Sequence, residues 1–128
     1  MNKLFSTIIL LSLLLSSNAY AKCVQGNCVN GQGTLVSHDR TYVGDFKNDR
    51  KYGQGTETYN NGSKYVGEFK NDKIHGQGTK RYVINGEYIA TYVGEWKNDL
   101  RDGIGTIIYP DGSKITGEYK KGKKVKRK

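Results

Sequence analysis

Three similar segments carry residue types that could do chemistry. The segment YVGEFKNDKIHGQGT, residues 65–79, contains the carboxylate of Glu68 and the imidazole of His75. Carboxylates and histidines are the usual general acids and bases of enzymes. Close copies of the segment occur at residues 42–56 and 92–106. The repetition leaves two interpretations, a catalytic group written three times or a building unit of the fold.

Comparison of the copies favours a structural role for the carboxylates. One acidic position recurs in four units, as Asp45, Glu68, Glu95 and Glu118. A catalytic acid and its base need different environments that separate their pKa values, whereas copies of one position share an environment. We therefore expect these acids to form cross-strand ion pairs with lysines such as Lys47, Lys70 and Lys97.

Other catalytic and metal-binding signatures are weak. His75 aligns with Tyr52 and Asp102 in the sister copies, so its position accepts unrelated side chains. No serine or cysteine stands in a nucleophile elbow, and the Gly-x-Gly steps lack the third glycine of a phosphate-binding loop. The Asn-Asp turns lack the acidic neighbours of a calcium loop. We expect no enzymatic activity, no metal and no cofactor.

A repeat organises the chain. It is marked by the glycine pairs Gly31/Gly33, Gly53/Gly55, Gly76/Gly78 and Gly103/Gly105, which begin 22, 23 and 27 residues apart. An aromatic-x-Gly step and a second aromatic residue follow each pair. These positions hold Tyr42, Gly44, Phe46, Tyr65, Gly67, Phe69, Tyr92, Gly94, Trp96, Gly117 and Tyr119, with Ile115 replacing the first aromatic residue of the fourth unit.

Each unit is expected to form a β-hairpin. In residues 56–69, two β-prone runs flank Asn60-Asn61-Gly62, and Lys-Asn-Asp at 70–72 supplies the next turn. Side chains alternate along a strand, so Tyr65, Gly67 and Phe69 share one face, where a ring can lie over bare glycine backbone. No segment has a sustained helical period. The sequence predicts an all-β fold.

The pattern Tyr-x-Gly-Glu-Phe/Trp-Lys-Asn-Asp followed by Gly-x-Gly-Thr resembles the MORN (membrane occupation and recognition nexus) repeat. The resemblance covers residues 31–119, in units of about 31–52, 53–75, 76–102 and 103–119. It implies an elongated, twisted single antiparallel sheet of consecutive hairpins, with functions in protein assembly and membrane association. Residues 22–30 resemble a shortened terminal unit.

The N-terminus reads as an export signal. Lys3 precedes an apolar run at 4–15, and Ala19-Tyr20-Ala21 fits a cleavage site, so residues 1–21 are interpreted as a signal peptide. An uncleaved anchor is the alternative. Export to a periplasm or out of the cell favours a disulfide between Cys23 and Cys28, which would contribute about 2 kcal/mol. We expect this disulfide to cap the open edge of the sheet.

The net charge of +9 is concentrated at the C-terminus. Residues 22–119 hold 13 basic and 12 acidic side chains, so the folded body carries no positive stripe for nucleic acid. The basic tail, residues 120–128, contains Lys120, Lys121, Lys123, Lys124, Lys126, Arg127 and Lys128. It suits anionic lipid or another envelope polyanion. A disordered, solubilising end that also blocks growth of the sheet is the alternative.

The third unit breaks the repetition with a longer hairpin at 82–92. Its aromatic residues Tyr82 and Tyr88, with the nearby Trp96, are candidate contacts for a partner, unless they only pack within the hairpin. Together these features predict an exported, non-enzymatic surface for protein interaction or scaffolding. Binding of anionic lipid or polyanions through the tail is the alternative function.

Overall fold

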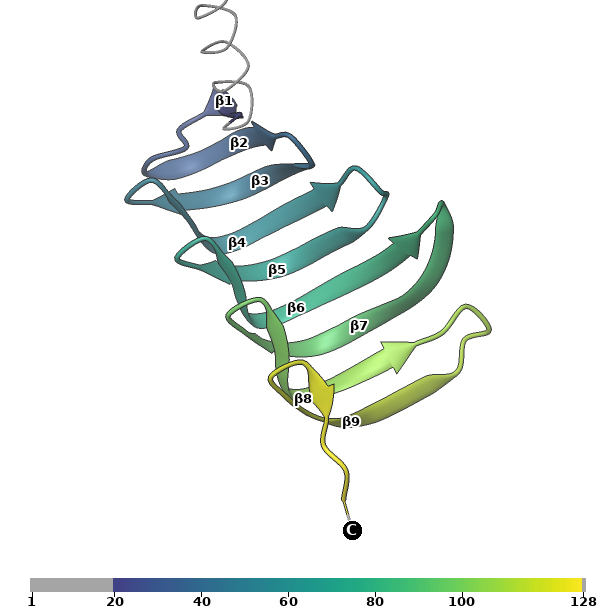
Figure 1. Cartoon of the computed structure of the whole chain (residues 1–128). Helices are drawn as coiled ribbons and strands as arrows, with labels where there is room; N and C mark the ends of the chain where they lie inside the picture. The colour runs from purple at the N-terminus through teal and green to yellow at the C-terminus, as the bar shows by residue number, and fades with distance from the viewer. Residues whose placement is uncertain (1–19, 128) are drawn as a thin grey trace, which may run out of the picture.

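The computed structural model describes residues 20–127 as one antiparallel sheet of consecutive strands (Figure 1). The strands are β1 (Ala21–Gly26), β2 (Gly31–Ser37), β3 (Arg40–Lys47), β4 (Arg50–Tyr59), β5 (Lys64–Lys70), β6 (Lys73–Ile84), β7 (Glu87–Lys97), β8 (Leu100–Ile108), β9 (Lys114–Lys120) and β10 (Lys123–Lys124). The all-β meander is confirmed. The predicted signal sequence lies almost wholly outside the described residues. Within them, no helix is long and apolar enough to cross a membrane.

Tight turns join the strands at one side of the sheet. Asn71 and Asp72 have φ angles of 49° and 70°, and Asn98 and Asp99 have 48° and 71°. Asn and Asp accept this left-handed conformation, which two-residue hairpins require. The predicted Lys-Asn-Asp turns are thus confirmed. Neighbouring turns on this side are also hydrogen-bonded to each other. The amide of Ile74, just after the turn at 71–72, donates to Asp99 Oδ1 at 2.9 Å, and the Asp99 amide donates to the carbonyl oxygen of Ile74.

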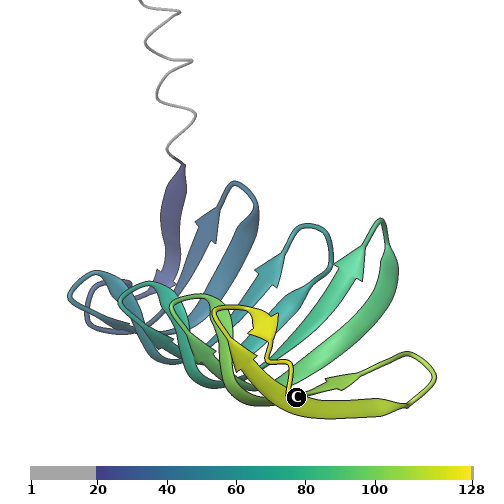
Figure 2. The ribbon, with the colours of Figure 1, turned by 60° about the horizontal axis from the view of Figure 1, so that its bottom comes forward.

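A row of glycines crosses the sheet where the strands bend. Successive partners in the register are Gly26, Gly33, Gly44, Gly55, Gly67, Gly78, Gly94, Gly105 and Gly117. The register slips just after Gly44, Gly67 and Gly94, and such bulges bend a strand and increase its twist. Figure 2 shows the result, a sheet whose tight-turn side curls over.

The core is a ladder of aromatic rings on one face of this sheet, here called the aromatic face. Edge-to-face contacts run from Phe46 through Tyr42, Phe69, Tyr65, Trp96 and Tyr92 to Tyr119, with ring centroids 4.9 to 5.7 Å apart. All seven side chains are buried. Aromatic pairs prefer this geometry, which adds stability beyond the area they bury. The prediction that aromatic residues and glycines share a face is confirmed.

The two ends of the sheet are closed differently. Cys23 and Cys28 form a disulfide, and Cys28 Sγ lies over Gly33, where other units place a tyrosine ring over glycine. At the C-terminus the predicted boundary at residue 120 is corrected. Lys121 and Gly122 form another tight turn, and Lys124 pairs with Tyr119, so the sheet continues through Lys124.

Candidate interaction surfaces

The repeated carboxylates close the bulges of the sheet. Asp45 Oδ2 accepts the Gln54 amide at 3.1 Å, and Glu68 Oε2 accepts the Gln77 amide. Glu95 accepts the Ile104 amide in the same way. Within residues 20–127 these three acids form no ion pair with lysine, so the predicted pairing is wrong. The bulge leaves a backbone N–H without a ladder partner, and the nearby carboxylate satisfies it.

The fourth repeated acid and the histidine show no catalytic arrangement. Glu118 Oε2 lies 3.3 Å from the guanidinium of Arg127 on an exposed surface. The half-buried His75 has an Nδ1 atom without a hydrogen-bond partner among the described residues. Residues 20–127 also contain no group of three histidine, cysteine or acidic side chains positioned for a metal ion. The structure therefore does not bring these groups together as a reactive set.

The aromatic candidates of the third unit divide into two kinds. Trp96 is only 4% exposed, and its Nε1 donates to the carbonyl oxygen of Gly78 at 3.2 Å. Its prediction as a partner contact is corrected, because its ring belongs to the core ladder. Tyr82 is half-buried and packs against the core. Tyr88 is also half-buried, its hydroxyl lies 2.9 Å from Thr91 Oγ1, and the Arg81 guanidinium lies 4.4 Å from its ring centroid.

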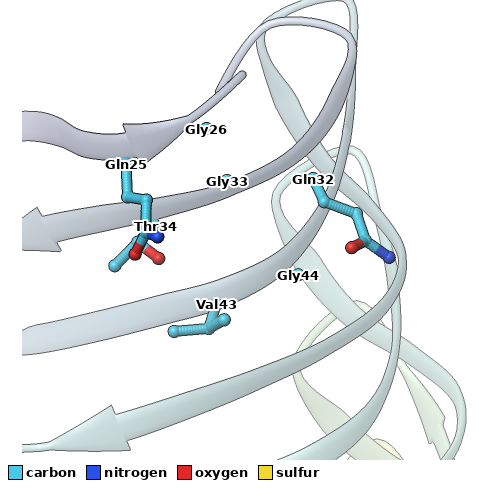
Figure 3. A pocket seen from close by; sticks show the side chains of 7 residues that line it. All are labelled: Gln25, Gly26, Gln32, Gly33, Thr34, Val43 and Gly44. Carbon is cyan, nitrogen blue, oxygen red and sulfur yellow. The ribbon is translucent and has the colours of Figure 1, made fainter.

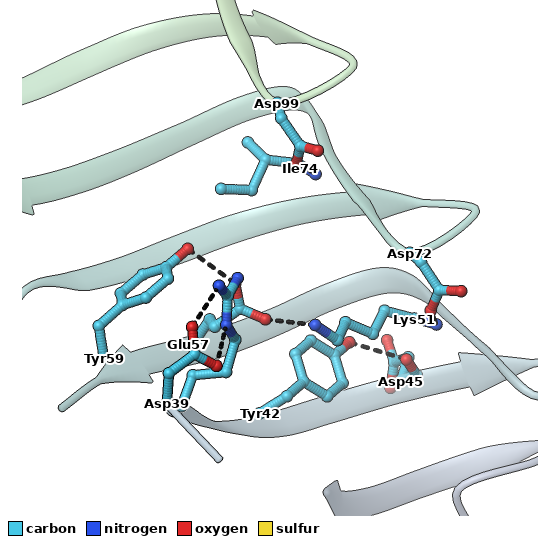
Figure 4. Close-up of polar contacts among 10 residues, drawn as sticks. Asp39, Tyr42, Asp45, Lys51, Glu57, Tyr59, Asp72, Ile74 and Asp99 are labelled. Carbon is cyan, nitrogen blue, oxygen red and sulfur yellow. Dashed lines mark hydrogen bonds and ion pairs between the residues drawn. The ribbon is translucent and has the colours of Figure 1, made fainter. Parts of the chain in front are cut away.

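A buried carboxylate cluster on the aromatic face was not predicted (Figure 4). Glu57 is 2% exposed, and its Oε1 accepts from the Tyr59 hydroxyl at 2.7 Å and from Arg40 Nη1 at 3.3 Å. The ammonium of Lys51 pairs with Oε2. Burial, followed by the bond to Glu57, raises the pKa of Tyr59. Both carboxylate oxygens of Glu57 have partners, so the cluster is a satisfied buried network that ties β3 to β4.

The repeat contained a signal for this cluster. The residue after each Gly-x-Gly-Thr is Leu35, Glu57, Lys80 or Ile107. Leu35 and Ile107 pack against the core, as expected for an inward-facing position. Charged residues at two of four equivalent inward positions must either find partners or carry a cost. Glu57 finds cationic partners, whereas Lys80 forms no ion pair among residues 20–127.

The opposite face presents an in-register row of β-branched residues, here called the Val/Thr row. It consists of Thr34, Val43, Thr56, Val66, Thr79, Val93, Thr106 and Thr116, each paired with the next. Figure 3 shows Thr34 and Val43 on neighbouring strands beside the glycine row. Val43, Val66 and Val93 are 52%, 47% and 42% exposed. Among residues 20–127, no second layer covers this face.

The predicted basic contacts lie at the C-terminal end of the sheet. Lys120, Lys121, Lys123, Lys124, Lys126 and Arg127 are exposed, and Lys128 lies outside the described residues. The Val125 amide donates to the carbonyl oxygen of Glu118 at 2.8 Å, which holds this segment against β9. The positive side chains therefore gather on an ordered end of the fold.

Comparison with known proteins finds three repeats in a different frame from the units defined above on the glycine pairs. The MORN repeat model matches residues 42–64, 65–87 and 92–114, more than half of the chain. Each match begins at the tyrosine that covers the next strand's glycine. No curated protein matches the chain. MORN repeats are generally non-enzymatic modules for protein or membrane interaction. The chain belongs to the MORN repeat family.

Proposed function

We propose that the protein is an exported, non-enzymatic scaffold whose sheet binds other proteins. The observation that carries this proposal is the Val/Thr row, an uncovered and regular row of β-branched residues across eight strands. Export rests on the apolar N-terminal run and the Ala19-Tyr20-Ala21 site.

The row differs from scattered surface valines. Its three valines alternate with threonines at register-paired positions, so exposed valines recur at every second strand along one line. Contiguous exposed apolar strips commonly mark interaction sites, whereas isolated apolar residues do not. β-Branched side chains also lose little conformational freedom on binding, because their χ1 angles are already restricted.

Cross-linking and capture from cell-envelope fractions test the scaffold. We expect wild-type protein to enrich defined proteins and Val66→Lys to lose them, because a charge would be buried in the contact. Tyr109→Lys is the matched control, since it adds the same charge at an exposed position on a hairpin end. Equal enrichment by wild type and Val66→Lys, or none by either, would refute this function.

The basic C-terminal end favours a second candidate, binding of anionic lipid or another envelope polyanion. Six exposed cations lie within residues 120–127, beside two acids: Glu118 is paired with Arg127, and Asp102 Oδ2 accepts the Lys121 amide at 3.2 Å. Clustered cations near an anionic membrane contribute around 1 kcal/mol each.

Co-sedimentation with phosphatidylglycerol vesicles at low and moderate salt tests this candidate. Truncation at residue 120 would remove β10, so charge substitution is cleaner. We expect Lys120→Gln, Lys123→Gln, Lys126→Gln and Arg127→Gln together to abolish binding. Substituting Lys47, Lys64, Lys70 and Lys97, which are exposed elsewhere, by Gln should preserve it. Equal loss in both variants would argue against a dedicated basic end.

A further inference from the structure

The elongated third hairpin borders a small, partly open apolar cavity on the aromatic face. Its volume is about 220 Å³. The walls include Tyr82 and Ile84 of β6, Ile89 and Ala90 of β7, and Arg101 and Ile107 of β8. Pockets for whole small molecules usually begin near 300 Å³. This cavity is therefore of a size for one large side chain.

The cavity rim carries aliphatic residues that the fold leaves in water. Ile84 is 56% exposed and Ile89 is 40% exposed, both next to the Asn85-Gly86 turn. These residues fall in the part of the hairpin that the other units lack. Exposed apolar side chains around a hollow resemble the pocket that receives an anchor residue in a protein interface.

Two cations beside this cavity have no carboxylate partner in residues 20–127. Arg101 forms part of its wall, and Lys80 precedes Tyr82 by two residues on the same face of β6. In the described part of the chain no acidic oxygen lies within ion-pair distance of either cation, whereas Arg40 and Lys51 share Glu57. Arg101 donates to the Gly122 carbonyl oxygen at 3.3 Å and lies 5.0 Å from the ring centroid of Tyr119.

Lys80 occupies a position where an apolar residue would suit the fold better. The equivalent Leu35 and Ile107 pack against the core. The Lys80 ammonium instead lies 4.9 Å from the Tyr59 ring centroid and 5.3 Å from that of Tyr82. Burial lowers its pKa despite the opposing attraction of the Glu57 carboxylate, so the fold disfavours its charged form. A cation kept at such a position indicates a role in contacting a negative group.

We propose that this cavity binds one large aliphatic or aromatic side chain of an extended partner polypeptide, while a neighbouring carboxylate of that polypeptide pairs with Arg101 or Lys80. The inference rests on the proposed scaffold function and specifies the chemistry of the partner. An acidic peptide fits both features, because it supplies an apolar anchor and an adjacent negative charge on one strand.

Defined peptides test the proposal on the full chain without its signal. The probe is fluorescein-labelled Gly-Ser-Glu-Leu-Glu-Ser-Gly, with versions that carry Phe or Ala at the centre or Gln in place of both Glu residues. Binding is followed by anisotropy and by isoleucine methyl resonances. We expect the Leu or Phe peptide to shift the methyl resonances of Ile84, Ile89 and Ile107, and to leave the methyl resonance of Ile104 unchanged. Ile104 is 53% exposed and lies three residues before Ile107 on β8, so it belongs to the opposite face of the sheet.

Variants separate the apolar and charged contributions. Ala90→Leu should fill the cavity and lower the affinity for the Leu peptide. Arg101→Gln should lower its affinity roughly tenfold, since it removes a charge-assisted pair with the peptide carboxylate. Arg101→Lys should restore part of that affinity, and Arg50→Gln, at an exposed site, should change nothing. Trp96 emission confirms that each variant is folded.

Three results would overturn the proposal: equal binding of the Leu and Ala peptides, shifts confined to Ile104, or perturbation of Ile84 and Ile89 by anionic vesicles alone. The last would assign the cavity to lipid. If Arg101→Gln still captures the wild-type set of cross-linked proteins while no peptide binds, the cavity inference fails and the scaffold function stands. If no protein is captured by any variant, the scaffold function itself fails.

Discussion

The hydroxyl of Tyr65 donates to the backbone carbonyl oxygen of Glu68 at 2.9 Å, while the side chain of Glu68 accepts the Gln77 amide of the next strand. The same phenol–carbonyl bond joins Tyr42 to Asp45 at 2.7 Å. Glu68 thus connects the ring ladder to the bulge. These two bonds give the recurring acid and aromatic positions a structural role in every complete unit.

Replacing Tyr65 with Phe should weaken the fold modestly. The ring contacts with Phe69 and Trp96 remain, but the carbonyl of Glu68 loses its phenol donor. We expect the free energy of unfolding to fall by about 1 kcal/mol. Urea denaturation followed by Trp96 emission measures this. Tyr52→Phe is the control, because Tyr52 is 42% exposed, and an equal loss in both variants would contradict the assigned bond.

A methyl group at Gly78 should be far more damaging. The Tyr65 ring lies over this glycine, so a Cβ atom would collide with the ring and its hydroxyl. The ring is fixed by its neighbours in the ladder, so we expect Gly78→Ala to cost ~3 kcal/mol or more. At Gly117 the added Cβ would meet only the flexible end of Lys124, and Gly117→Ala should cost much less. Thermal melting of both variants provides the comparison; similar losses would be inconsistent with this packing.

The repeat made most of the fold predictable. Strand alternation placed Tyr65, Gly67 and Phe69 on one face, and positive-φ propensity placed the Asn-Asp turns. Both inferences depend on local rules that a repeat states several times over. The extra residues of the third unit likewise indicated a longer hairpin, which is β6–β7 in the structure.

The details that failed depend on geometry between neighbouring strands. The bulge beside Gly67 frees the Gln77 amide, and nothing in the local sequence shows that Glu68 will reach it. Trp96 was predicted as a partner contact because it follows the irregular hairpin at 82–92. Its repeat position is that of Phe69, and this position predicts its burial correctly. The three-dimensional environment of Lys80 depends on its distance from Glu57 across two strands, which the sequence alone does not specify.

Buried phenols make the fold sensitive to alkaline pH. Burial is the main cause that raises the pKa of Tyr92 to about 12 from an ordinary value of 10.0. The folded state therefore holds this proton more tightly than the unfolded chain, so its stabilisation is complete below pH 10 and is lost as pH rises toward 12. We expect unfolding free energies to decline across that interval.

The contribution of Tyr92 is isolated by comparison with Tyr92→Phe. Lysines also titrate in this interval, and subtracting the two pH profiles removes their effect. The variant should show a flatter decline, and tyrosinate absorbance of the wild type should rise in step with loss of Trp96 burial. Parallel profiles for the two proteins would show that Tyr92 titrates equally in both states.

Replacing Lys80 with Ile should stabilise the protein and impair its binding. Ile occupies the equivalent position 107, and burial lowers the Lys80 pKa below its ordinary 10.5. The effect of Lys80 has the opposite sign to that of Tyr92. Its penalty on the free energy of unfolding disappears as pH rises, because deprotonation removes the charge that burial disfavours. We expect a gain of ~1 kcal/mol near neutral pH, as for other substitutions that relieve a functional compromise. That gain should shrink as pH approaches 10.5.

Lys64→Ile is the matched control for this substitution, since Lys64 is exposed and Lys80 is half-buried. It should leave stability near the wild-type value at every pH. If Lys80→Ile lowers the free energy of unfolding, then the contacts of the ammonium with the rings of Tyr59 and Tyr82 outweigh its desolvation. If it raises stability and also weakens the Glu-Leu-Glu peptide, the cation is retained against the preference of the fold, because its partner carries the missing carboxylate.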